Sequence, residues 1–100
     1  TVETDNVPLS FQLKQNFPNP FNPITQIYFD LPFASPVEIS IYNIQGNRIQ
    51  TLLQKTLEAG FHNVTWNGHN DADQPSSSGF YFYRIHAGQY TETRKMILIK

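Results

Sequence analysis

Apolar and polar residues alternate with a period of two along almost the whole chain, and this feature constrains the fold more than any other. Residues 25–31 place Ile27, Phe29 and Leu31 at every second position, and residues 37–42 repeat the pattern. Pro, Gly and Asn interrupt these runs at short intervals. Successive side chains of a strand point to opposite faces, so each run predicts a strand with one buried face. The chain is therefore expected to be all-β.

About seven strands are expected, and this count with short turns is typical of an immunoglobulin-like antiparallel β-sandwich. Leu52 and Leu53 are adjacent and break the alternation, which predicts a β-bulge or the end of regular pairing. The expected strands are a short one at Phe11 and Leu13, followed by residues 25–31, 37–42, 48–56, 62–66, 80–86 and 89–99.

The inward positions of these runs define the expected core, and the single tryptophan, Trp66, is its natural anchor. The predicted core residues are Ile27, Phe29, Ile39, Ile41, Val64, Trp66, Tyr81, Tyr83, Ile85, Met96 and Leu98.

The chain of 100 residues is expected to form one domain with a short leading segment. Residues 1–8 include Glu3 and Asp5 and few apolar side chains, so they are expected to link to an upstream cargo domain. The sandwich is then expected to occupy residues 9–100. The chain begins at Thr1 without an initiator Met, which favours a piece of a longer polypeptide.

Residues 16–23 read Asn-Phe-Pro-Asn-Pro-Phe-Asn-Pro. A proline has no N–H to donate to a strand ladder, so this segment is not expected to be a central strand. We expect an extended, polyproline-like crossing, with Phe17 and Phe21 tucked beneath the edge of the sandwich.

Composition argues against several classes of partner. The charges of seven basic and eight acidic residues nearly cancel, so no strong electrostatic attraction to nucleic acid or to an anionic membrane is expected. The chain has no Cys, so disulfides and thiolate-bound metals are excluded. No apolar run reaches the roughly 18 residues of a membrane span, so direct membrane insertion is not expected.

No catalytic, metal or cofactor site is expected, and the chain is not expected to be an enzyme. His69, Asp71 and Asp73 offer ligands for a hard cation, but they lie in a polar loop that is better interpreted as a solvated turn. The serines at 76–78 have no neighbouring base, and the carboxylates are scattered singly.

Phe80 and Phe82 are expected to share one strand face with Arg84 and His86. This stripe has two interpretations. It is either an exposed platform that stacks on sugar rings or docks a partner, or a face covered by the N-terminal Phe-Pro segment. The second is favoured because large apolar patches are rarely left bare.

Five motifs occur in order along the chain: residues 15–23 (Gln-Asn-Phe-Pro-Asn-Pro-Phe-Asn-Pro), 41–46 (Ile-Tyr-Asn, then Gly46), 59–68 (Ala-Gly-Phe-His to Trp-Asn-Gly), 78–88 (Ser-Gly-Phe-Tyr-Phe-Tyr-Arg-Ile to Ala-Gly) and 95–100 (Lys-Met-Ile-Leu-Ile-Lys). Together they resemble the type A C-terminal sorting domain of proteins exported by the bacterial type IX secretion system. The resemblance covers residues 13–100. The chain is also similar to the immunoglobulin-like domain of flagellar hook-capping proteins.

The resemblance implies a C-terminal sorting signal that directs the export of its parent protein. The parent protein would enter the periplasm, and the folded tail would be recognised by the outer-membrane translocon and its shuttle proteins. A surface sortase-like protease would then cleave within residues 1–8, leaving the cargo at the cell surface or outside the cell. By position, the recognition elements would be Gly79, Tyr81, Gly88, Lys95 and Lys100.

Physical chemistry supplies a mechanism for such recognition, and rival functions remain open. Residues 95–100 are expected at the end of the closing strand, whose edge would offer backbone groups and whose lysines would offer charge. The alternative is a carbohydrate-binding or spacer module of a secreted hydrolase, with an aromatic platform at Phe80 and Phe82 or at Tyr28 and Tyr42. A structural cap that self-associates is a third class.

Overall fold

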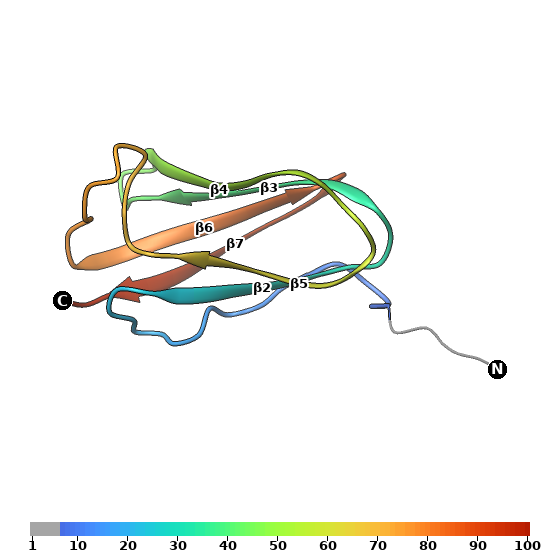
Figure 1. The fold of residues 1–100 in the computed structure, drawn as a ribbon, viewed down its shortest axis with the longest axis horizontal. Coiled ribbons are helices and arrows are strands. Elements are labelled where there is room, and N and C mark those ends of the chain that lie inside the picture. Colours follow the sequence, from blue (N-terminus) through green and yellow to red (C-terminus); the bar gives the residue numbers. More distant parts are fainter. Residues whose placement is uncertain (1–6) are drawn as a thin grey trace.

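Two antiparallel sheets pack face to face in the computed structural model, which describes residues 7–100 (Figure 1). One sheet has the strand order β1-β2-β5 and the other β4-β3-β6-β7. The predicted all-β immunoglobulin-like sandwich is confirmed, and most of the expected leading segment lies outside the described residues. No helix in residues 7–100 is long and apolar enough to cross a membrane. The strands are β1 (Gln12–Leu13), β2 (Thr25–Leu31), β3 (Ser35–Tyr42), β4 (Arg48–Leu57), β5 (Gly60–Trp66), β6 (Gly79–Ala87) and β7 (Tyr90–Leu98).

Strand β2 shows how the alternation translates into packing. It pairs with β5 along its whole length, from Thr25 opposite Trp66 to Leu31 opposite Gly60. The inward side chains of β2 are buried as expected. Asp30, expected on the solvent side, is buried as well, because β1 lies alongside and brings the Lys14 ammonium within 3.4 Å of its carboxylate. A paired charge tolerates such burial better than a lone one.

The β3–β4 hairpin contains the predicted β-bulge. Ile39 pairs with Leu53 and Ser40 pairs with Thr51, so Leu52 has no partner on β3. The connecting turn is held by Asn43, whose Oδ1 accepts hydrogen bonds from the backbone N–H groups of Gln45 and Asn47, each at 3.0 Å. Bulges at an edge strand interrupt the ladder that another strand would need for pairing.

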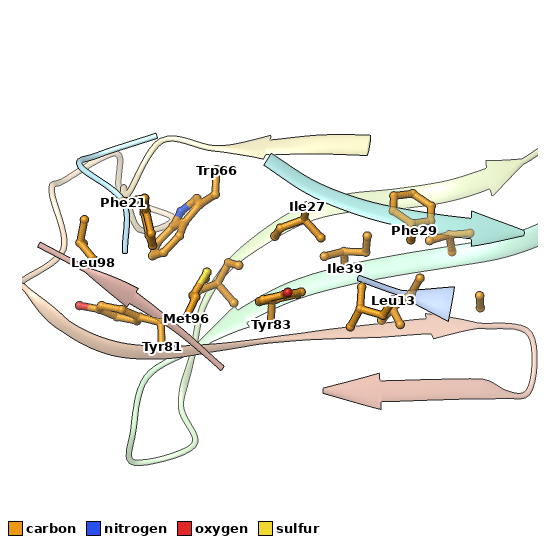
Figure 2. Close-up of a cluster of buried hydrophobic side chains, with 14 of the residues drawn as sticks. Leu13, Phe21, Ile27, Phe29, Ile39, Trp66, Tyr81, Tyr83, Met96 and Leu98 are labelled. Atoms are coloured by element: carbon orange, nitrogen blue, oxygen red, sulfur yellow. The ribbon is translucent and has the colours of Figure 1, made fainter. Parts of the chain in front are cut away.

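The core lies between the sheets (Figure 2), and every predicted core residue except Val64 is buried. Val64 is half-buried because β5 is an edge strand. At one end of the core, Trp66 packs against Phe21 and Tyr81, with ring centroids 5.6 and 5.4 Å apart. The core also includes five residues beyond the predicted set, namely Leu13, Phe21, Leu31, Val37 and Ala87.

Candidate functional site

The outer edge of β7 carries a segment from the beginning of the chain. We call residues 15–23 the N-terminal strap. Its Gln15 Nε2 donates to Lys95 O at 2.9 Å, and its Asn19 Oδ1 accepts from Ile97 N at 3.0 Å. Phe21 N donates to Ile97 O at 3.0 Å, and Phe21 O accepts from Ile99 N at 2.9 Å. These backbone groups of β7 and of Ile99 just after it are therefore already paired, and edge pairing with a partner at Lys95 to Ile99 would first require displacement of the strap.

The strap differs from the expected extended crossing. It bends at residues 18–20 and 22–23, between bridges to opposite sheets. Phe21 is 1% exposed, as predicted, but Phe17 is 71% exposed and the prediction for it was wrong. Phe17 exchanges two backbone hydrogen bonds with Gln26 at the edge of β2, which leaves its ring in solvent. The strap thus ties one sheet to the other.

Tyrosines hold the start of the strap onto the four-stranded sheet. The Tyr83 hydroxyl donates to Lys14 O at 2.7 Å and accepts from Asn16 N at 2.8 Å. Burial raises the pKa of Tyr83 to about 12 because the tyrosinate would lose its hydration. Tyr90 accepts from Leu13 N at 3.1 Å and donates to Glu92. Desolvation, reinforced by the Glu92 carboxylate, raises the pKa of Tyr90 to about 12.

The five predicted recognition residues do not form one site. Gly79 pairs with Leu98 at the same end of the sandwich as the exposed side chains of Lys95 and Lys100. Tyr81 is 7% exposed and donates its hydroxyl hydrogen to Ser77 O at 2.6 Å, so it supports the core from inside. Gly88 lies in the β6–β7 turn, roughly 30 Å away along β6 at the rise of a strand. Only the two lysines present side chains that a partner can contact.

Gly88 has a conformational role in that turn. Its φ is +61°, in the left-handed region that favours glycine, and its N–H donates to Pro36 O at 3.1 Å. These features account for the Ala-Gly motif at residues 87–88 without a binding partner.

The outer face of β6 is not covered by the strap, so the favoured interpretation of Phe80 and Phe82 was wrong. Phe80 is 47% exposed and Phe82 is half-buried. The strap instead inserts Phe21 against Trp66 in the core, on the opposite face of the sheet. The Lys95 ammonium lies 5.1 Å from the centre of the Phe80 ring, which is the geometry of a cation–π contact.

The loop between β5 and β6 keeps its polar groups occupied locally. His69 Nδ1 and Asp73 Oδ1 are 2.8 Å apart, and Asn70 Oδ1 accepts from the backbone N–H groups of Ala72 and Gln74 at 3.0 Å. Within residues 7–100, no three His, Asp or Glu side chains gather in a way that could hold a metal ion. His62 and His86 lie on different strands of different sheets.

Asn16 and Asn19 are structural residues that the sequence interpretation did not single out. The buried Asn16 donates from Nδ2 to Thr25 Oγ1 at 2.9 Å and to Pro18 O at 3.1 Å. The available signal was the repeated Asn next to Pro. Where proline removes backbone donors, an asparagine side chain can supply the missing hydrogen bonds.

Comparison with solved structures finds the same fold in several proteins, including the following three. Dimeric latent PorU from Porphyromonas gingivalis aligns over 98% of this chain with a TM-score of 0.72 and 18% identity. PorZ, an essential bacterial surface component of the type-IX secretion system of Porphyromonas gingivalis, aligns over 86% with a TM-score of 0.60 and 16% identity. The Pseudomonas fluorescens alkylpurine DNA glycosylase AlkC, bound to DNA containing an abasic site analog, aligns over 90% with a TM-score of 0.54 and 11% identity. The chain spans 10%, 11% and 30% of these proteins, respectively.

Comparison at the sequence level gives the family. No curated protein sequence matches the chain. Residues 24–91, from the residue before β2 into the start of β7, match the family profile of the FlgD Ig-like domain. This match covers more than half of the chain and agrees with the sandwich described above. The chain therefore belongs to the FlgD Ig-like domain family.

Proposed function

We propose that this chain is a type A sorting domain, which directs a larger cargo protein across the outer membrane through the type IX secretion system and is not itself an enzyme. One observation carries the proposal: motifs far apart in the sequence meet at the C-terminal end of β7. The strap bonds to Ile97 and Ile99, and Pro23 O lies 3.1 Å from where a Cβ on Gly68 would stand. Three of the five motifs thus meet at one end of the sandwich.

The structural comparisons support this proposal at the level of fold. PorZ is a surface component of the type-IX secretion system, and its matching region shares the sandwich with this chain. PorU, from the same bacterium, matches across nearly the whole chain. A fold of this kind is consistent with a module that passes through the periplasm and ends at the cell surface or outside the cell.

Recognition in this proposal uses exposed charge on a preordered surface. Lys95 and Lys100 are exposed at the end of the sandwich to which the strap is hydrogen-bonded. Binding to a preordered surface costs less conformational entropy than binding to a flexible tail, because the tail would have to become ordered on binding. The proposed partners are the translocon and its shuttle proteins, followed by a sortase-like protease that cleaves within residues 1–8 and separates the cargo.

An export assay tests the proposal. Residues 9–100 are fused to a fluorescent reporter that carries a periplasmic signal, in a bacterium that has this secretion system. The unaltered fusion is expected at the cell surface, and the double variant Lys95→Gln, Lys100→Gln is expected to remain in the periplasm. Lys55→Gln, an exposed lysine on β4, is the matched control and should be exported normally.

Two results would count against the proposal in different ways. Periplasmic retention of the unaltered fusion would contradict the sorting function itself. Normal export of the double lysine variant would contradict the role of these lysines. Deletion of residues 95–100 is a poor test, because it removes the buried Met96 and Leu98 and would abolish export simply by unfolding the domain.

The carbohydrate-binding alternative fits the geometry less well. Stacking on a sugar needs an open aromatic ring face. The Arg84 guanidinium lies 4.8 Å from the centre of the Tyr42 ring, and the Lys95 ammonium lies 5.1 Å from that of Phe80. One face of each ring is therefore occupied by a cation.

A further inference from the structure

The outer face of the four-stranded sheet is divided into two chemically different halves. Cross-strand pairing sets Tyr42 beside Phe82 and Phe82 beside Lys95. Arg84 lies two residues after Phe82 on β6 and therefore shares this face. We call the half that contains Tyr42, Ile44, Phe80, Phe82, Arg84 and Lys95 the aromatic face. The other half is polar, with Glu38 opposite His86 and His86 opposite Thr91. On this face, the exposed apolar side chains therefore lie at the end where the β3–β4 hairpin and the C-terminus are found (Figure 1).

A groove crosses the aromatic face. Its volume is about 260 Å³, and it is lined by Tyr42, Asn43, Ile44, Gly46, Phe82, Arg84 and Thr93. Ile44 at its rim is 69% exposed. Small-molecule sites usually measure about 300–1,000 Å³, so this groove suits a single apolar side chain of a larger partner better than a free small molecule.

The charged side chain that lines the groove is a cation, whereas the acidic Glu38 lies on the polar half of the face, opposite His86 and next to the Ser40–Arg84 pair. Arg84 lines the groove, none of its lining residues is acidic, and Lys95 lies one rung away beside Phe82. Within residues 7–100, neither Arg84 nor Lys95 forms a salt bridge, whereas Lys14, His69 and Arg94 each pair with a carboxylate. Arg84 is held in place by its stacking on Tyr42 and by a 3.1 Å hydrogen bond from Nε to Thr93 Oγ1. Both cations are preordered without a carboxylate of their own.

We propose that the aromatic face is a docking surface for an acidic segment of a partner protein, with one aromatic or aliphatic side chain in the groove and Asp or Glu residues beside Arg84 and Lys95. Charge complementarity selects this occupant over the others. Nucleic acid would require a longer row of cations along its phosphates than Arg84, Lys95 and Arg48, which pairs with Tyr42 on β4, can provide. A sugar would require open ring faces, which the two cations restrict. The proposal does not depend on the route by which the chain is exported.

Binding of a pair of synthetic peptides to the full chain tests the proposal. The first is a short peptide with a central Phe flanked by Asp and Glu, and its twin carries Asn and Gln in place of every carboxylate. NMR titration of the labelled chain with the acidic peptide is expected to shift the backbone amide signals of Tyr42, Phe82, Arg84 and Lys95. Arg84→Gln and Lys95→Gln should each weaken its binding by about tenfold, which corresponds to about 1.4 kcal/mol. Lys55→Gln should bind like the unaltered chain, and added salt should weaken binding.

Several outcomes would overturn the proposal. These are no shift at the aromatic face at millimolar peptide, equal binding of the uncharged twin, or unchanged affinity of both cation variants. Larger chemical-shift changes at this face with an anionic polysaccharide or with single-stranded DNA than with the acidic peptide would assign the face to another class of partner. Concentration-dependent shifts at the same residues without peptide would assign it to a second copy of the chain. Arg84→Lys, which keeps the charge, controls for local distortion and should retain most of the affinity.

Discussion

At the scale of single residues, Tyr83 connects the core to the beginning of the chain. Its ring is fully buried, and its hydroxyl satisfies both Lys14 O and Asn16 N. Tyr83→Phe keeps the ring but leaves these backbone groups without a partner. We expect a loss of about 1–3 kcal/mol in the free energy of unfolding, measured by urea denaturation. Tyr28→Phe, on the exposed face of β2, is the control and should change stability little.

The same tyrosine makes stability depend on alkaline pH. The pKa of Tyr83 is raised in the fold from its ordinary value of 10.0 to about 12, so the folded chain holds the proton more tightly than the unfolded chain. Its contribution to stability is complete below pH about 10 and is lost as the pH rises through about 12. Tyr90 contributes in the same direction. Tyr83→Phe should therefore show a shallower decline over this range, and an unchanged pH profile would contradict the assignment.

At the scale of elements, the strap and β7 depend on each other. Asn19 supplies the only side-chain acceptor that the described residues offer to Ile97 N, at 3.0 Å. Asn19→Ala should accelerate amide hydrogen exchange at Ile97 by about fivefold, which corresponds to a net hydrogen bond of about 1 kcal/mol. Asn19→Asp keeps an acceptor and should preserve most of the protection. The measurement is residue-resolved exchange by NMR.

A control within the same element separates this effect from a general loosening of the strap. Asn22→Ala alters an exposed residue of the strap and should leave exchange at Ile97 unchanged. If Asn19→Ala and Asn22→Ala accelerate exchange equally, Asn19 has no specific role in holding the edge of β7.

At the scale of the whole molecule, Trp66 joins the two sheets and the strap at one end of the core. It lies on β5, and its ring contacts Phe21 of the strap and Tyr81 of the opposite sheet (Figure 2). Trp66→Ala should destabilise the domain by about 3–5 kcal/mol, a large part of the roughly 5–15 kcal/mol available to a domain of this size. A mostly unfolded protein is expected by circular dichroism. Phe61→Ala, an exposed position on the same strand, should melt almost normally, and a native-like melting temperature for Trp66→Ala would contradict this placement.

Much of this architecture was predictable from local pattern. The bounds of β2 were predicted without error, and the bulge at Leu52 followed from two adjacent leucines. Both features depend on the period of the side chains, which residues a few positions apart determine. Asp30 shows the limit of such reasoning. The alternation placed it correctly on the outer face, but whether that position is exposed depends on a neighbouring strand.

The candidate recognition surface was less predictable for the same reason. Lys95 and Lys100 were found from sequence, and both are exposed. Gly79, Tyr81 and Gly88 were grouped with them by resemblance, but the structure buries Tyr81 and separates Gly88 along the length of β6. Residues of a family motif can be required for turns and packing as well as for recognition, and Gly88 and Tyr81 have such structural roles here.

The sequence by itself determined the all-β class, the strands and the inward face of each, because the two-residue period of a strand is a local property of the chain. Only the tertiary structure decided what covers each edge and face. The strap reaches β7 through contacts such as that of Asn19 with Ile97, 78 residues apart in sequence. Edge pairing and face coverage depend on where distant segments meet, so the closing strand is covered by its own chain while Phe80 and its neighbours stay open to solvent.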